Sequence, residues 1–431
     1  MRRRQFIRAS SLAGLSAGIS GPLIPRRHFR YSLALIGSGW WGVNILREAI
    51  RSGEVDVVAL CDVDERQLDL AAAEVGRLCA DRPHRYRDFR ECLERERPDI
   101  VINATPDHWH ALVAIAALRS GAHLFLEKPI GHTVKEGTAI QQAVEETGKV
   151  CIVDFHRRYS PHNVSGMEFL RAGKAGEIRE VKAFVHYNGS RPEPWTEEPV
   201  PAGLDWDFYC GPSERVPYSA AIHPRRWRQY SHFANGQLGD WAPHWFDQIL
   251  WWTEEKAPRS IHGTARYHPA PAASDMPVSQ VVTYTFESFT CTWEHSLLNR
   301  RPQQPGENVG VHFHGTLGTF HMGWQQGWAF YPHDEKQPVM RQAAALDEPD
   351  SQNIRLVWQD FLNAIKTGSE PFAGIEQGRQ ATNMALLGML STRLGRSIDW
   401  DHPNDRIPGD EPANAMLRRD YRRPWEYPDL L

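Results

Sequence analysis

One stretch of the chain spaces two carboxylates and a histidine so that they could move a proton on a hydroxyl group. Asp240, His244 and Asp247 recur at helical spacing, and Pro243 suits the first turn of a helix, which would place Asp240 just before it. A histidine with a carboxylate on either side has a pKa that can be tuned near neutrality, as a general base for an alcohol requires. On spacing alone, a hydrogen-bonded structural histidine is slightly favoured.

Lys128 is a second residue whose position favours chemistry. It follows Ala122–Leu126, which indicates a buried strand, and it precedes Pro129, which fixes the backbone. The ammonium would therefore be held at the end of the strand, where it could stabilise negative charge on a reacting oxygen. A solvated loop lysine is the alternative that position alone leaves open.

Three glycines predict a nucleotide site. Gly37, Gly39 and Gly42 follow an apolar run that starts at Tyr31, and a helical pattern follows them. Gly37 permits a tight turn, Gly39 lets the main chain approach a pyrophosphate, and Gly42 lets the helix pack closely on the strand. The start of the helix offers free N–H groups to phosphate.

The next apolar run supplies the second half of this site. Asp56–Cys61 indicates another buried strand, and it ends on Asp62, where a carboxylate would meet the adenosine ribose hydroxyls. The acid favours NAD over NADP, although the nearby Arg66 keeps NADP open. The full set of cofactor-binding residues that we predict is Gly37, Gly39, Trp41, Gly42, Asp62, Thr105, Pro106, His108, Glu127 and Lys128.

These residues must be positioned by a parallel sheet. Short apolar runs alternate with helical patterns over residues 31–154, which predicts a Rossmann domain with helices on both faces of its sheet. Ligands bind beyond the carboxyl ends of such strands, where the glycine turn, Asp62 and Lys128 all fall.

The remaining residues, 155–431, predict a second α/β domain with a large, mostly antiparallel open sheet. The predicted strands are Ile178–Tyr187, Ile261–His268, Val278–Glu287, Thr290–Leu297 and Val309–His314, and the predicted helices are Gln352–Ile365 and Glu376–Leu394. Arg191–Ala220 and Gly323–Asp350 are predicted to be long loops.

Composition excludes several classes of function. With 41% hydrophobic and 24% charged residues the chain is ordinary globular protein, and its formal net charge of −4 provides no basic field for nucleic acid. The cysteines contain no C-x-x-C pair, so neither zinc nor a disulfide framework is expected. His312 and His314 share one face of a strand, but no third ligand is evident nearby, and no metal site is expected.

The first thirty residues have the layout of an export signal. Arg2-Arg3-Arg4-Gln5-Phe6-Ile7-Arg8 precedes an uncharged stretch, Ala9–Pro25, that is shorter than a spanning helix. Paired arginines followed by Phe6 indicate the twin-arginine route, and hence a periplasmic protein with no stable membrane span. A disordered N-terminus on a cytoplasmic protein is the alternative.

Taken together, these motifs resemble the Gfo/Idh/MocA family of oxidoreductases over nearly everything after Tyr31. The matching pieces are the glycine turn, Ala104-Thr105-Pro106-Asp107-His108, Glu127-Lys128-Pro129, Arg157-Arg158-Tyr159 and the D-x-x-x-H of Asp240 and His244. Leu204-Asp205-Trp206-Asp207 and His223-Pro224-Arg225-Arg226-Trp227-Arg228 resemble its exported bacterial branch.

The resemblance implies NAD(P)-dependent hydride transfer at a hydroxyl carbon of a sugar, glycoside or polyol, in a homo-oligomer formed through the broad sheet. It also implies that Lys128, Asp240 and His244 form the catalytic group. Substrate contacts are expected from Arg158, Trp206, Trp227, Trp241 and Asp247.

Two other activities occur among such relatives. Some use a transient oxidation by bound NAD to cleave glycosides, and the best-known of these have a Tyr-centred motif where this chain has Gly239-Asp240-Trp241-Ala242-Pro243-His244. Others bind NAD(P) and sugar only as sensors, against which the intact Lys128, Asp240 and His244 argue.

Overall fold

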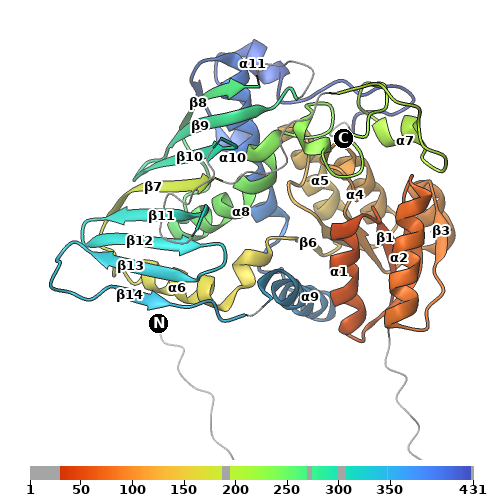
Figure 1. Ribbon diagram of the computed structural model, residues 1–431, viewed down its shortest axis with the longest axis horizontal. Coiled ribbons are helices and arrows are strands. Elements are labelled where there is room, and N and C mark those ends of the chain that lie inside the picture. Colours follow the sequence, from red (N-terminus) through yellow and green to blue (C-terminus); the bar gives the residue numbers. More distant parts are fainter. Residues whose placement is uncertain (1–29, 187–194, 269–273, 299–306, 347, 429–431) are drawn as a thin grey trace, which may run out of the picture.

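Two β-sheets organise the computed structural model of the protein, one parallel and one mostly antiparallel (Figure 1). The structure describes residues 30–186, 195–268, 274–298, 307–346 and 348–428. The predicted leader, residues 1–30, lies outside this description except for Arg30.

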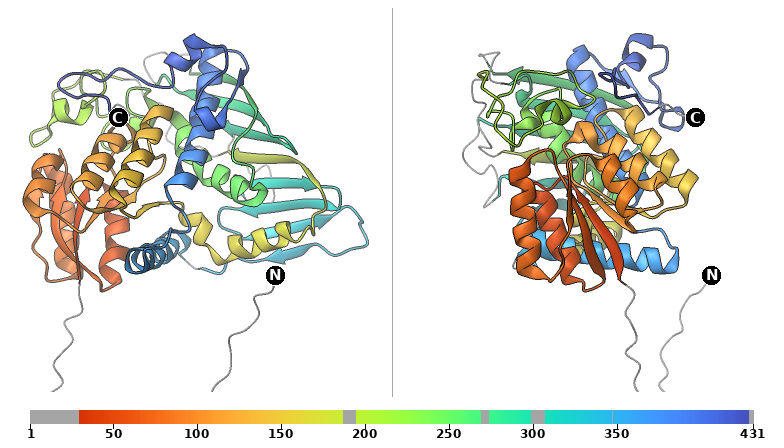
Figure 2. Two further views of the ribbon diagram at one scale, coloured as in Figure 1. Left: turned by 180° about the vertical axis from the view of Figure 1, so that it is seen from behind. Right: turned by 90° about the vertical axis from the view of Figure 1, so that its right-hand side faces the viewer.

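The first sheet confirms the predicted Rossmann fold. Its strands pair in the order β3-β2-β1-β4-β5-β6, all parallel, and helices cover both faces (Figure 2). The strands are β1 (Tyr31–Ile36), β2 (Val55–Cys61), β3 (His84–Tyr86), β4 (Ile100–Asn103), β5 (His123–Leu126) and β6 (Cys151–Val153). The helices are α1 (Trp40–Arg51), α2 (Glu65–Leu78), α3 (Phe89–Glu96), α4 (His110–Arg119) and α5 (Val134–Thr147).

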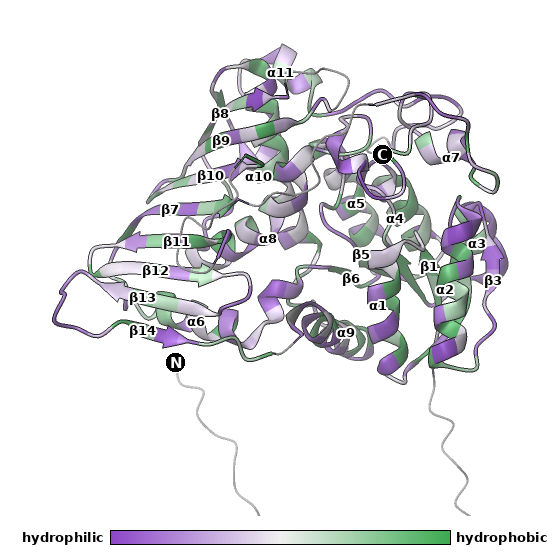
Figure 3. Cartoon of the chain, in the orientation of Figure 1, coloured by the Kyte–Doolittle hydropathy of each residue, from purple (hydrophilic) through white to green (hydrophobic). Residues whose placement is uncertain are grey.

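The central strands of this sheet are apolar on both faces because helices cover both. Leu33 to Leu35 in β1 and Ile100 to Ile102 in β4 have no exposed surface, and Figure 3 shows the same strands as the hydrophobic centre of the domain. Continuous apolar runs are therefore what this sheet requires.

The second sheet confirms the mostly antiparallel prediction, with one parallel pair between β7 and β10. Its order is β14-β13-β12-β11-β7-β10-β9-β8-β15. The strands are β7 (Ile178–Val185), β8 (Ser260–Tyr267), β9 (Pro277–Thr285), β10 (Thr290–Ser296), β11 (Val309–Gly315), β12 (Gly318–Gly323), β13 (Trp328–Pro332), β14 (Met340–Gln342) and β15 (Ile398–Asp399).

The predicted loop Gly323–Asp350 is wrong over part of its length, because β13 and β14 lie within it. Neither strand alternates between buried and exposed residues, which is the pattern that identifies a half-buried strand. In β14 all three residues are exposed, because this strand lies at the edge of the sheet. β12, just before that loop, was not predicted either.

Helices that follow the first domain in the sequence pack on this sheet and also contact the first domain. α6 (Pro161–Arg171), α8 (Gly236–Thr253) and α10 (Ile375–Leu394) contact the strands, whereas α9 (Pro349–Thr367) packs on α1 and α10 also packs on α5. The short helices are α7 (Trp206–Cys210), α11 (Glu411–Ala415), η1 (Asp107–Trp109), η2 (His156–Tyr159), η3 (Trp227–Gln229) and η4 (His402–Asn404).

Helix α8 begins seven residues before Pro243, which corrects the predicted start of this helix. Gly236 adopts a φ of +61° at its first residue, and Pro243 lies in the helix interior. Asp240 is thus inside the second turn of the helix and not in a turn before it.

Within the described ranges, none of the helices combines the length and apolar character that crossing a bilayer requires. His312 and His314 have ring centroids 5.8 Å apart. No three histidine, cysteine or acidic residues of the described chain gather as a metal site would need.

Candidate active site

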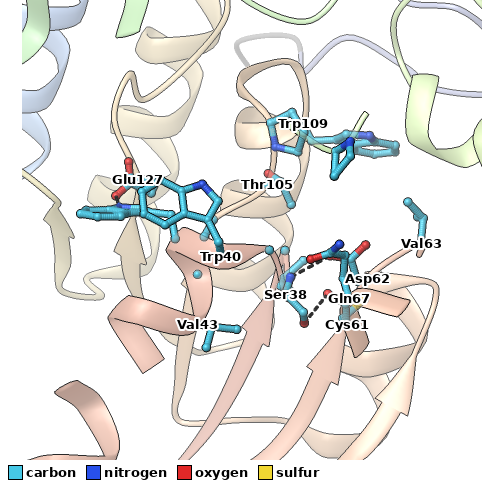
Figure 4. Close-up of a pocket in the computed structure, with 18 of the residues that line it drawn as sticks. Ser38, Trp40, Val43, Cys61, Asp62, Val63, Gln67, Thr105, Trp109 and Glu127 are labelled. Atoms are coloured by element: carbon cyan, nitrogen blue, oxygen red, sulfur yellow. Dashed lines mark hydrogen bonds between the residues drawn. The ribbon is translucent and has the colours of Figure 1, made fainter. Parts of the chain in front are cut away.

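A cavity of about 640 Å³ lies at the carboxyl edge of the parallel sheet. Asp62 and Gln67 border it on one side, and Trp40 and Glu127 on the other (Figure 4). Of the residues predicted to bind a cofactor, those that line this cavity are Gly37, Gly39, Trp41, Gly42, Asp62, Thr105, Pro106, Glu127 and Lys128.

The glycine turn has the shape that a pyrophosphate needs. A Cβ on Gly37, whose φ is +90°, would lie 2.5 Å from the carbonyl carbon of Ala104, and a Cβ on Gly42 would lie 2.2 Å from the oxygen of Gly37. Nothing lies within 4 Å of the same position on Gly39. Two glycines therefore allow close packing, and the third leaves open space at the start of α1.

Asp62 is fixed at the opposite end of this turn. Its carboxylate accepts a hydrogen bond from the backbone N–H of Ser38 at 2.8 Å (Figure 4). It also accepts one from the backbone N–H of Asp64 at 3.0 Å. Burial raises its pKa to about 6 despite these bonds. The open turn and a held carboxylate at the end of β2 fit a dinucleotide with free ribose hydroxyls.

A segment of the second domain covers this cavity. Glu65 N–H donates to Gly203 O at 2.9 Å, and His223 Nε2 lies 2.9 Å from Asp64 Oδ2. The guanidinium of Arg225 lies 5.6 Å from the ring of Trp40 across the cavity lining. The sequence offered only the resemblance of this segment to the exported branch, with no signal for its position over the nucleotide site.

Lys128 reaches from the cavity to helix α8. Its Nζ donates to Asp240 O at 2.8 Å and to Asp240 Oδ1 at 2.9 Å, and Arg228 Nε lies 2.9 Å from the same carboxylate oxygen. Burial would raise the pKa of Asp240, but Arg228 and Lys128 together hold it below its usual value. The result is an anchored ammonium beside an ionised carboxylate at the end of the cavity.

His244 lies in an aromatic environment, which corrects the expected carboxylate pairing. Its ring centroid is 4.9 Å from that of His156, 5.3 Å from that of Trp324 and 6.5 Å from that of Trp241. Burial, followed by the charge of Lys128, lowers its pKa well below the usual value. The expected pKa near neutrality is therefore wrong, because burial and the charge of Lys128 both disfavour the protonated ring.

Comparisons with known proteins match both halves of the chain. The family model described as "Oxidoreductase family, NAD-binding Rossmann fold" matches residues 31–155, and the one described as "GFO/IDH/MocA C-terminal domain" matches residues 206–321. The chain belongs to the Gfo/Idh/MocA family. Its first domain is thus an NAD-binding Rossmann domain.

Individual relatives are similar over only part of their length. A "Glycosyl hydrolase family 109 protein" of Stenotrophomonas maltophilia is 29% identical over 252 residues, which are 55% of this chain and 52% of the relative. An "Alpha-N-acetylgalactosaminidase" of Shewanella oneidensis is 30% identical over 159 residues, which are 36% of this chain and 35% of the relative. The chain thus spans about half of the first and a third of the second.

A solved structure shares the fold over most of the chain. The aldose-aldose oxidoreductase from Caulobacter crescentus, crystallised with glycerol, superposes with a TM-score of 0.66 at 18% identity, covering 86% of this chain and 100% of that one. At this identity the likeness shows the fold alone.

Two predicted substrate contacts, Arg158 and Asp247, are buried partners of one ion pair and do not line the cavity, so their contact with substrate stays a prediction. Arg158 Nη2 donates to Asp247 Oδ1 at 2.5 Å, and Arg158 Nε contacts both carboxylate oxygens at 3.0 and 3.1 Å. The Asp247 side chain is 1% exposed, and the two charges neutralise each other in the interior.

Two further predicted site residues do not line the cavity. His108, in η1 of the first domain, is fully buried with Nε2 2.8 Å from Tyr209 O, and Trp206, in the covering segment, donates to Val216 O at 2.7 Å. Both side chains thus bind backbone carbonyls of the covering segment, and their predicted roles stay predictions. Trp227 lines the cavity on the nucleotide side, and Trp241 is half-buried beside His244.

The sequence also missed residues that surround the catalytic candidates. Trp324 contacts His244, and Arg157 lies 4.3 Å from the ring of Trp324. Asp107 was expected as a helix cap, but the η1 cap residue is Pro106, and burial raises the pKa of Asp107 to about 8. Asp154 directly follows β6, as Glu127 directly follows β5. This position at the carboxyl end of a parallel strand is a signal that could have predicted Asp154 as a site residue.

Proposed function

We propose that this protein is an NAD-dependent oxidoreductase that transfers hydride between a hydroxyl-bearing carbon of a carbohydrate and the nicotinamide. One observation carries the proposal: Lys128 lines the same cavity as the glycine turn and is bonded to Asp240, one helical turn before His244. NAD is favoured over NADP by the half-buried carboxyl of Asp62, which would repel a 2′-phosphate once ionised.

The side chains divide the chemistry between them. The bound nicotinamide supplies the hydride acceptor. Lys128 donates a hydrogen bond to the substrate oxygen and stabilises negative charge that develops there, while Asp240 and Arg228 hold the ammonium in place. His244 accepts the hydroxyl proton, and its lowered pKa keeps the imidazole neutral and able to do so near pH 7.

A carbohydrate is the substrate class that the surroundings of His244 favour. Trp241 and Trp324 have ring centroids 5.0 Å apart and both lie near the histidine ring. Ligand sites combine such aromatic walls with a few convergent polar groups, which here are Lys128, Asp240 and His244. A sugar presents apolar ring faces to the former and hydroxyls to the latter.

A second candidate is cleavage of a glycoside with the cofactor recycled inside the enzyme. The names of the relatives from Stenotrophomonas and Shewanella favour this activity, as does the segment that covers the nucleotide cavity. In that cycle a transient ketone would make the neighbouring C–H acidic, loss of this proton would expel the aglycone, and water would add to the resulting enone. The hydride held by the cofactor would then return to the ketone.

One experiment separates these activities. NAD-loaded protein is incubated in deuterated water with a panel of hexoses, polyols and glycosides, including an N-acetylgalactosaminide, while nicotinamide reduction and aglycone release are followed. Net reduction indicates a dehydrogenase. Aglycone release without net reduction, with deuterium beside the oxidised carbon, indicates the hydrolytic cycle. Tight NAD binding with neither signal would favour a sensor.

Replacing His244 tests its role directly. We expect His244→Ala to lower kcat by about 10²–10⁴-fold, because a general base in the transition state is worth that much. NAD binding, measured by calorimetry, should stay within the range of the wild type because His244 is not part of the cavity wall. Full turnover in this variant would contradict the assignment.

We also propose that the protein is exported by the twin-arginine route and acts as a homo-oligomer. The paired arginines before Phe6 support the first, and the broad open sheet supports the second. Fusion of residues 1–30 to a folded reporter, with Arg3 and Arg4 replaced by lysine as the control, tests export. Light scattering of the purified protein tests assembly.

A further inference from the structure

Two carboxyl groups meet beside the catalytic lysine. Glu127 follows β5 and Asp154 follows β6, and these strands pair in register, with Leu126 opposite Val153. The indole N–H of Trp41 donates to Glu127 Oε1 at 2.5 Å and lies 3.3 Å from Asp154 Oδ2. Burial, and then the charge of Asp154, raises the pKa of Glu127 well above its usual value. Burial thus disfavours negative charge on both carboxyl groups at this place.

His156 stands between this pair, His244 and the protein surface. Its Nδ1 is 3.4 Å from Asp154 Oδ1, and its Nε2 is 3.8 Å from Asp350 Oδ1. The ring packs against that of His244, with centroids 4.9 Å apart. His156 is 2% exposed, whereas the side chain of Asp350 is 51% exposed, so the three groups run from the interior to solvent.

Several polar atoms along this line are buried without a hydrogen-bond partner. In the part of the chain that the structure describes, these atoms include Nδ1 of His244, both ring nitrogens of His156 and Oδ1 of Asp154. Buried polar atoms are normally satisfied, so a run of them around two adjacent histidines calls for a function.

We propose that His156 relays the proton that His244 accepts from the substrate to Asp350 and solvent. The proposal rests on the proposed function, because alcohol oxidation by NAD⁺ places a hydride on the nicotinamide and releases one proton. His244 passes this proton to His156, which gives it up at Nε2 to the Asp350 carboxylate, and water removes it from there. The reverse sequence returns a proton when a ketone is reduced.

The charges around His156 suit transient proton transfer. Asp350 and Glu127 favour its protonated form, while Arg157 and Lys128 oppose it, and burial, the largest effect, lowers its pKa to about 4. Asp154 faces its Nδ1, and the neutral ring of His244 packs on it. A proton on His156 is thus stabilised enough to pass but not enough to remain.

The test compares two signals from the NAD-loaded enzyme after rapid mixing with a substrate from the panel. Nicotinamide reduction is followed by absorbance, and proton release by a pH indicator in weak buffer. We expect the two signals to coincide in the wild type. In His156→Gln and in Asp350→Asn, proton release should lag behind, and turnover should fall by roughly tenfold, less than the loss of the base itself.

Added imidazole should restore turnover in His156→Gln, because a diffusing base can replace a missing relay but cannot repair a packing defect. His162→Gln is the matched control: His162 is also buried, burial lowers its pKa to about 4, and its ring bonds Ser160 Oγ at 2.8 Å. Glu348→Gln is the surface control for Asp350, at the start of the same helix. Neither should respond to imidazole.

If proton release coincided with nicotinamide reduction in both His156→Gln and Asp350→Asn, and imidazole had no effect on either, the relay would be wrong. The proposed function would still stand. Absence of nicotinamide reduction in the wild type would instead be a failure of the proposed function, and the relay would fall with it. A readout without substrate is nuclear magnetic resonance of histidine-labelled, NAD-loaded enzyme. The His156 pKa should fall further in Asp350→Asn, and an unchanged value would overturn the exit step.

Discussion

Helix α8 carries two aspartates seven residues apart, and each forms an ion pair with a base from a distant part of the chain. Asp240 pairs with Lys128 and Arg228 and retains 21% of its side-chain exposure, next to the cavity. Asp247 pairs with Arg158 and is sealed, with the rings of Trp251 and Phe372 at 5.1 and 5.0 Å from the guanidinium.

The difference teaches that residue type and helical spacing do not separate a site from a core. Two cations hold the pKa of Asp240 below its usual value against burial, whereas burial outweighs the single cation and raises the pKa of Asp247. The first pair anchors an ammonium that faces a ligand cavity. The Arg158–Asp247 pair joins η2 to α8, and we expect it to stabilise the fold.

The largest effect on stability should come from breaking the buried Arg158–Asp247 pair. Asp247→Ala leaves the Arg158 guanidinium buried without its partner, which should lower the free energy of unfolding by about 3–5 kcal/mol. Denaturation by urea, with and without NAD, measures it. Because Asp247 lies away from the cavity, turnover per folded molecule should change little.

A double variant sharpens the same point. Arg158→Met combined with Asp247→Leu replaces the pair by apolar side chains among the surrounding aromatic rings, and such exchanges are often neutral or stabilising. Most of the lost stability should return. If the double variant remained as unstable as Asp247→Ala, or if it lost turnover while folded, the pair would have a role at the site.

Breaking the Lys128–Asp240 pair should lower activity more than stability, the reverse of the result expected for the Arg158–Asp247 pair. Lys128→Met should lower kcat by about 10²–10³-fold, equivalent to about 2.7–4 kcal/mol, because it removes a donor to the charge that develops on oxygen. The free energy of unfolding should fall by less than in Asp247→Ala, because Arg228 still pairs with the Asp240 carboxylate.

Lys182→Met is the control for this variant. Lys182 pairs with Glu294 on the second sheet at 2.9 Å, the same distance as the Lys128–Asp240 pair, but it lies on no wall of the cavity. Turnover should be unaffected. A large loss of stability in Lys128→Met, with kcat unchanged, would assign this pair to the fold as well.

The sequence predicted the first domain well because its signals are local. Apolar runs that are buried on both faces mark each strand, and the residues at their carboxyl ends, Gly37, Asp62 and Lys128, necessarily meet at one edge of a parallel sheet. Asp154 obeys the same rule and could have been found in this way.

The catalytic surroundings were less predictable because they depend on contacts distant in sequence. Lys128 and Asp240 are 112 residues apart, and their bond takes Asp240 away from the histidine that follows it on the helix. Trp324 lies between β12 and β13, in a stretch that the sequence predicts to be a loop. The cover over the cavity also depends on tertiary packing, which no local pattern encodes.

The smallest expected effect is on the pH dependence of stability, which should differ in sign between Asp240 and Asp247. The lowered pKa of Asp240 stabilises the fold above about pH 4, and this contribution is lost as pH falls through the native pKa. The raised pKa of Asp247 acts in the opposite direction. Between about pH 4 and that raised value the native state binds the extra proton, so stability is lost as pH rises.

Asparagine variants isolate these contributions because asparagine does not titrate. Relative to Asp240→Asn, the wild type should lose stability on acidification below about pH 4. Relative to Asp247→Asn, it should lose stability as pH rises from about 4, by about 1.4 kcal/mol for each pKa unit of difference between the native and unfolded states. Urea denaturation of the three proteins across this range measures both slopes. Slopes of the same sign would mean that the two aspartates have the same environment, and the distinction between the open and the sealed pair would fail.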